Sequence, residues 1–173
     1  MNMKDSIGDL PSLDSIYVKA VQQTNSDISE ALLALTFATL PYREIPLVIP
    51  VLGIKVYFPL ISAGEEIFRR KNNNMPRFIY FDSPLSENSD IDKPAHFFGS
   101  AFLSYTSNIF DLGNLIGYFV EAFEEDFKVQ AKIDTRDLMT NKLGNIFGEM
   151  VKTDRRVLPS WIFLTASFRK MKF

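Results

Sequence analysis

The chain of 173 residues has no cysteine and a single histidine, His96. Without cysteine there is no disulfide, zinc–thiolate site, iron–sulfur cluster or cysteine nucleophile. A Ser-His-Asp catalytic site would have to use His96. The basic excess that a phosphate-binding surface needs is also missing, because 19 basic side chains face 21 acidic ones, a net charge of −2. Nucleic acid is therefore not expected as a partner, and no cofactor is expected.

Signals for secretion and for membrane insertion are missing as well. Residues 1–10 (MNMKDSIGDL) have no apolar core of the secretory type. The most apolar segment, Ile45 to Gly64, is interrupted by three prolines and Lys55, which does not suit a transmembrane helix. The next candidate, residues 97–120, has Asp111 in its middle. The absence of cysteine fits the cytosol and a periplasm equally well.

What is present is an ordinary globular composition, with 46% hydrophobic and 23% charged residues. The predicted fold class is α+β and mainly α. A bundle of three or more helices occupies the C-terminal half, and a small proline-broken β element precedes it. Three parts are expected. Residues 1–25 form an N-terminal arm, residues 26–91 a helix plus short strands, and residues 92–173 a glycine-striped helical module.

Local signals place the elements of the first half. A helix is predicted at Ile28–Leu40, because Ser26 or Asp27 can cap it and a proline follows it. Residues 45–61 are rich in β-branched and aromatic residues and cut by prolines, which predicts two short extended pieces. Further predictions are a short helix at Glu65–Lys71, a turn at Asn72–Asn74 and a strand at Arg77–Phe81, followed by a loop at Asp82–Ile91.

The second half is predicted to be mostly helical. Asp92 can cap a helix that ends near Tyr105, with Pro94 in its first turn. The other expected elements are a long helix at Gly113–Val129, a third helix from Asp134 to about Val151, and a tail at Leu158–Phe173 for which helix and strand are equally supported.

Each of the three C-terminal helices carries a stripe that combines glycine with polar side chains at spacings of three and four. Glycine inside a helix costs about 1 kcal/mol against alanine, so it usually has a packing reason, here close approach of helices. If the three stripes face inward, His96, Glu121, Asp137 and Asn141 meet in a buried polar cluster.

This cluster has two interpretations. In the catalytic one, His96 is a general base or acid held by Glu121, and Asp137 and Asn141 orient a substrate or a metal. A metal set would consist of His96, Glu121 and Asp137, and whether a metal binds is left open. In the structural one, His96 makes structural hydrogen bonds, Asp134 and Asp137 cap their helix, and Asn141 ties helix ends together.

The same residues resemble the pattern of the VanZ-like and YfiM-like bacterial envelope proteins. DKPAHF at 92–97 matches the Asp-Lys-x-x-His-Phe opening, Glu121 takes the place of the family glutamate, and DTRDLMTNKLGNIFG at 134–148 matches the closing helix. The match covers a third of the chain. The resemblance implies a helical module at or in the bacterial cell envelope, without a defined biochemical role. It places the chain in the periplasm or at the membrane periphery, with the cytoplasm as the alternative.

Three functions follow as hypotheses. The first is an envelope-associated, non-catalytic helical module that contacts a membrane surface or an envelope partner protein. Its motivation includes the tail, where Arg169, Lys170 and Lys172 accompany Trp161 and Phe168 and suit anionic lipid. The second is a small hydrolase or metal-dependent enzyme built on the polar cluster. The third is a lipid or apolar-ligand carrier, because 16 phenylalanines could line a pocket. The oligomeric state is left open.

Overall fold

The computed structural model describes residues 6–49, 54–60, 62–86, 89–107 and 135–171. Within these ranges the chain forms six helices and two strands, so the prediction of a mainly helical fold is confirmed. In chain order the elements are α2 (Asp9–Gln23), α3 (Ile28–Ala38), β1 (Glu44–Ile49), β2 (Ile54–Pro59), α4 (Glu65–Asn74), α5 (Lys93–Thr106), α7 (Thr135–Thr153) and α8 (Pro159–Met171).

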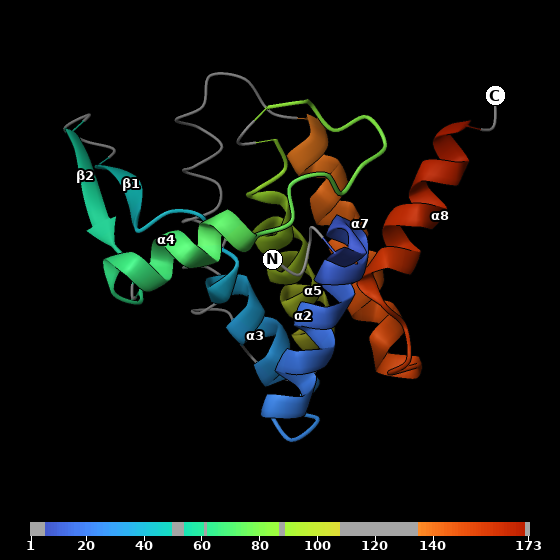
Figure 1. The fold of residues 1–173 in the computed structure, drawn as a ribbon. Coiled ribbons are helices and arrows are strands. Elements are labelled where there is room, and N and C mark those ends of the chain that lie inside the picture. The colour runs from blue at the N-terminus through green and yellow to red at the C-terminus, as the bar shows by residue number, and fades with distance from the viewer. Residues whose placement is uncertain (1–5, 50–53, 61, 87–88, 108–134, 172–173) are drawn as a thin grey trace.

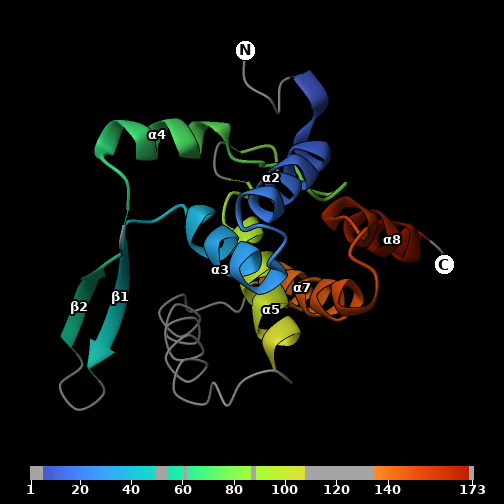
Figure 2. The same ribbon diagram turned by 90° about the horizontal axis from the view of Figure 1, so that it is seen from below.

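An aromatic core joins α2, α5, α7 and α8, and Figures 1 and 2 show how these four helices are arranged. The ring of Phe97 on α5 lies 5.3 Å from Phe98, 5.1 Å from Phe147 on α7 and 4.9 Å from Phe163 on α8, between centroids. Tyr17 on α2 meets Phe147 edge-on at 5.1 Å. Ile28, Leu32 and Leu35 of α3 belong to the same core, so one core spans all three parts that the sequence predicted as separate units.

The expected N-terminal arm is wrong for residues 9–23, which form α2. Leu13 and Tyr17, four residues apart, are buried in the core. The Asp14 carboxylate accepts a hydrogen bond of 2.8 Å from the backbone N–H of Ser160, at the start of α8. The many polar residues of this segment concealed the spacing of four, which is the spacing of one helix face.

The predicted start of α3 is confirmed, whereas the predicted end of α4 is wrong. Helix α3 begins after Asp27, whose carboxylate accepts a hydrogen bond of 3.0 Å from the backbone N–H of Glu30, so this predicted cap is confirmed. Helix α4 does not end at Lys71 but continues to Asn74. The three asparagines that predicted a turn form its last turn instead.

A β element packed with the helices is not supported. Strands β1 and β2 pair with each other in antiparallel register, with Glu44 opposite Pro59. Figures 1 and 2 show this hairpin standing apart from the bundle. Residues 77–81, predicted as a strand, form a loop in which Ile79 and Tyr80 are buried. Burial in a helical core rather than pairing of strands explains their apolar and aromatic character. The tail forms α8, a helix.

The helix predicted at Gly113–Val129, which includes Glu121, lies outside the described residues. Within the described ranges, no helix combines the length and apolar character needed to cross a membrane.

Candidate functional site

Helices α5 and α7 approach each other closely through two glycines. A Cβ at Gly144 would collide with the backbone carbonyl of Phe97, and one at Gly148 with the carbonyl of Ala101. Only glycine permits this approach, so the packing role predicted for these two residues is confirmed. The contacts advance in the same direction along both helices. The helices are therefore parallel, and their N-terminal ends meet.

A polar cluster lies where these two ends meet. We define it as Asp92, Lys93 and His96 from the start of α5 with Asp137 and Asn141 from the first turns of α7. The Lys93 side chain is only 4% exposed, and its Nζ lies 2.5 Å from Asp137 Oδ1. The same Nζ donates to both oxygens of Asp92, at 2.9 and 3.1 Å. The ammonium thus joins the two helices.

The charge of Lys93 is set by opposing effects. Burial by itself lowers the pKa of Lys93, because it penalises the charged ammonium. The Asp92 carboxylate and the hydrogen bond with Asp137 raise it, and the net result is a pKa above the ordinary value. Lys93 is therefore a cation at neutral pH and balances one of the two carboxylates.

His96 contacts both of its predicted partners on α7. Its Nδ1 lies 3.2 Å from Asn141 Oδ1, an oxygen that only accepts, so Nδ1 carries the proton in this hydrogen bond. Its Nε2 lies 3.9 Å from Asp137 Oδ1, beyond hydrogen-bond distance. The structure thus brings together three of the four predicted site residues, and the fourth, Glu121, lies outside the described residues.

Asp92 and Lys93 belong to the cluster, although the sequence prediction gave them no place in it. Asp92 occupies the predicted cap position, but its carboxylate makes no capping hydrogen bond and binds Lys93 instead. Lys93 lies three residues before His96 and hence on the same face of the helix. From that spacing, the sequence could have predicted that Lys93 belongs to the cluster.

The cluster offers the donor set of a metal site. Asp92, His96 and Asp137 each present one ligand atom, and these atoms all lie within 4.8 Å of one another. Carboxylate and imidazole ligands suit divalent transition metals. However, the ammonium of Lys93 already lies between the two carboxylates, where the cation would bind. A metal would have to displace it, so the geometry favours an ion-pair cluster over a metal centre.

A second ion pair borders the cluster. Arg136 Nη2 donates to Asp90 Oδ1 at 2.9 Å, and the Asp90 side chain is only 1% exposed. Nη1 of the same arginine donates to the carbonyl of Asp82 at 3.0 Å, and the guanidinium lies over the ring of Tyr80. The Tyr80 hydroxyl is 2.7 Å from that of Thr140. These contacts hold the loop before α5 against the first turns of α7.

No family model matches the chain, and no curated protein or solved structure is detectably similar to it. The resemblance of residues 92–148 to the VanZ-like and YfiM-like proteins therefore stays a prediction without support from these comparisons.

Proposed function

We propose that the chain is an envelope-associated, non-catalytic helical module that binds an anionic membrane surface through α8. In this proposal the polar cluster has a structural role, because it holds α5 and α7 together. The contact with the membrane belongs to a different face of the molecule. The observation that carries the proposal is the apolar outer face of α8.

Helix α8 has one buried face and one exposed face. Ile162 and Phe163 are in the core, at 6% and 0% exposure. Trp161, Leu164 and Phe168 are 50%, 45% and 65% exposed. Their spacing of three and four residues makes them one stripe along the helix. Figures 1 and 2 show α8 at the edge of the bundle, with its C-terminal end outermost.

Positive charge follows this stripe along the chain. Arg169 and Lys170 belong to the last turn of α8, and Lys172 comes directly after it. Each basic residue near an anionic surface contributes about 1 kcal/mol. A fully buried apolar side chain contributes about 1.5–3 kcal/mol, and a half-exposed one has about half of that left to gain. The two contributions are similar, so we expect binding to need anionic lipid and to weaken with salt.

The polar cluster supports a non-catalytic role. Its central position is filled by the Lys93 ammonium, so it lacks room for a reacting group between the two carboxylates. Ser100, the hydroxyl nearest to His96 in the sequence, lies one helical turn further along. Its Cβ packs against Gly144, in the interface between the two helices.

The test uses Trp161, the only tryptophan of the chain, as its reporter. Vesicles of phosphatidylcholine with about one-third phosphatidylglycerol should shift its fluorescence to the blue and carry the protein into the pellet, whereas pure phosphatidylcholine should do neither. The triple variant Trp161→Gln, Leu164→Gln, Phe168→Gln should stay in the supernatant and keep its melting temperature.

The matched control changes two exposed apolar residues of another helix, Ile146→Gln and Met150→Gln on α7, which are 40% and 42% exposed. This variant should sediment with anionic vesicles like the wild type. Equal binding of the triple variant and the wild type, or no binding of the wild type, contradicts the proposal.

A further inference from the structure

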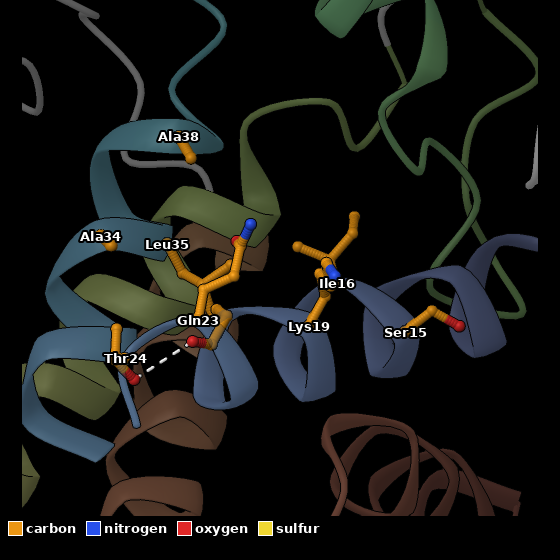
Figure 3. A pocket seen from close by; sticks show the side chains of 9 residues that line it. Ser15, Ile16, Lys19, Gln23, Thr24, Ala34, Leu35 and Ala38 are labelled. Carbon is orange, nitrogen blue, oxygen red and sulfur yellow. Dashed lines mark hydrogen bonds between the residues drawn. The ribbon is translucent and has the colours of Figure 1, made fainter. Parts of the chain in front are cut away.

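A groove between α2 and α3 takes no part in the proposed membrane contact (Figure 3). It has a volume of about 540 Å³, within the range of small-molecule sites. Its lining comes from these two helices and from Thr24, which begins the short turn that joins them.

The walls of the groove are mostly apolar. Ile16 and Ala20 from α2 face Ala34, Leu35 and Ala38 from α3. Three of these five residues are alanines, and their small side chains leave the space open. A larger residue at the exposed positions 34 or 38 would fill it without entering the core.

Two polar side chains at the rim have no partner among the described residues. Lys19 and Gln23 lie one helical turn apart on α2, and the structure gives neither side chain a hydrogen bond or an ion pair with the described residues. The other polar side chains are satisfied, because Ser15 donates to the carbonyl of Pro11 at 2.8 Å and Thr24 to that of Ala20 at 3.1 Å. Among the described residues, the lining therefore has a free cation and no carboxylate.

We propose that this groove binds a single-chain amphiphile with an anionic head group, such as a fatty acid. The acyl chain lies between Ile16, Ala20 and the two alanines of α3. The head group pairs with the Lys19 ammonium and accepts a hydrogen bond from the Gln23 amide. From residue 15 to residue 24 the groove extends about 14 Å at 1.5 Å per residue along α2, which matches an extended chain of about twelve carbons.

Titration calorimetry without vesicles tests the head group and the chain separately. Monomeric dodecanoate should bind one per chain, and dodecyltrimethylammonium, which has the same tail and the opposite charge, at least about tenfold more weakly. Shortening to decanoate should weaken binding by about tenfold, since two buried methylenes are lost. Equal binding of the two head groups would overturn the proposal.

Variants locate the binding. Ala38→Leu should weaken dodecanoate binding at least about tenfold, whereas Ala63→Leu, at an exposed position outside the groove, should not change it. Lys19→Gln should abolish the preference for the anionic head group, whereas Lys142→Gln on α7 should keep it. Unchanged binding by Ala38→Leu overturns the proposal.

Two further measurements distinguish the groove from the outer face of α8, and a fatty acid from a protein occupant. The α8 triple variant should bind dodecanoate like the wild type, so that failure of the membrane proposal and failure of this one are distinguishable. Light scattering of wild type and Ala38→Leu tests a protein occupant. If the wild type self-associates and the variant is monomeric, a second copy of the chain fills the groove and the proposal is wrong.

Discussion

At the residue scale, the Lys93 ammonium lies between the carboxylates of Asp92 and Asp137 and links the first turns of α5 and α7. A buried pair of charges is weak evidence for stability by itself, because both groups lose water. Removing one partner is costly, however, since the other charge is left buried without compensation. The helix contact therefore depends on Lys93 more than on any hydrogen bond of His96.

Lys93→Met should lower the free energy of unfolding by about 3–5 kcal/mol, because Asp137 stays buried without its cation. Urea unfolding followed by circular dichroism measures the change. Lys142→Met on the exposed face of α7 is the control and should change stability by less than about 0.5 kcal/mol. Adding Asp137→Asn to Lys93→Met should restore part of the loss. A stable single variant would show that the cluster does not hold the helices together.

Metal analysis distinguishes the structural cluster from the metal-dependent enzyme. After dialysis against Zn²⁺ and then buffer, wild type should retain no stoichiometric metal and EDTA should not change its melting temperature, because Lys93 fills the cation position. His96→Ala should melt a few degrees lower from loss of its hydrogen bond to Asn141. One zinc per wild-type chain, absent from His96→Ala, would instead establish a metal centre.

Above about pH 10, a rise in pH should destabilise the fold. Burial raises the pKa of both Tyr17 and Tyr80 to about 12, from an ordinary value of 10. Between these values the folded chain keeps protons that the unfolded chain has lost, so the free energy of unfolding falls as pH rises. Lys93, whose folded pKa is also raised, stabilises fully below pH 10.5 and loses this contribution at higher pH.

Absorbance at 295 nm measures tyrosine ionisation, and urea unfolding from pH 8 to 12 measures the loss of stability. Tyr80→Phe should remove one of the late-ionising groups from the absorbance titration. Simultaneous ionisation of Tyr17 and Tyr80 near pH 10 in the folded protein would refute the assignment.

At the element scale, the parallel docking of α5 and α7 rests on backbone-to-backbone contact at Gly144 and Gly148. The atoms that an added Cβ would meet include the carbonyls of Phe97 and Ala101, which cannot rotate away as a flexible side chain could. The helices would have to separate along their whole contact. This would also move Lys93 relative to Asp137, so packing and electrostatics are coupled here.

Gly144→Ala should destabilise the protein by about 2 kcal/mol, because a collision with backbone puts the overpacking cost at the upper end of about 1–3 kcal/mol and the gain in helix propensity is only about 1 kcal/mol. Gly148→Ala should behave similarly, and the double variant should be less stable than either. Asn145→Ala, at the exposed position between them, is the control and should be neutral or slightly stabilising. Thermal unfolding is the measurement, and an equally stable Gly144→Ala would disprove the close contact.

At the scale of the whole molecule, α2, α3, α5, α7 and α8 share one core, to which α4 contributes no buried residue, and the hairpin of β1 and β2 stands outside it (Figure 2). The chain on the N-terminal side of the hairpin is fastened to α4, since Asn72 donates to the carbonyl of Pro41 at 3.0 Å and Lys71 donates to that of Leu40. We therefore expect the core to fold without the hairpin.

Replacing residues 45–58 by a short glycine–serine linker should change the free energy of unfolding of the helices by less than about 1 kcal/mol, because loop closure depends only weakly on loop length. Thermal unfolding followed by circular dichroism at 222 nm measures this. A variant without the hairpin that unfolds many degrees lower would show that the hairpin is part of the cooperative unit.

Several starting points of helices could be predicted because they depend on neighbours in the chain. Asp27 caps α3 through a donor three residues away, and Asp92 with Pro94 marks the start of α5. The loop at residues 77–81 could not be predicted, because its aromatic residues suit a strand and a buried loop equally. The sequence did not decide between helix and strand for the tail for the same reason, because β propensity has less influence on the structure than burial of the side chains.

The candidate site likewise has residues whose positions could be predicted from the sequence and residues whose positions could not. The glycine spacing of α7 placed Asp137 and Asn141 on the face that meets α5, because helical periodicity converts sequence distance into direction. The pair of Arg136 and Asp90 had no such signal, since the two residues are 46 positions apart. Their contact exists only because the loop before α5 folds back over α7.

The sequence by itself determined a mainly helical chain, several helix starts and a glycine-lined face, because capping and periodicity act within a few residues. The tertiary structure alone decided that α2 is part of the core, that Lys93 fills the centre of the polar cluster and that Trp161, Leu164 and Phe168 stay exposed. Each of these outcomes depends on which surfaces of the helices pack against each other. Burial and close packing over the whole chain determine this, and the conformational preferences of individual residues do not.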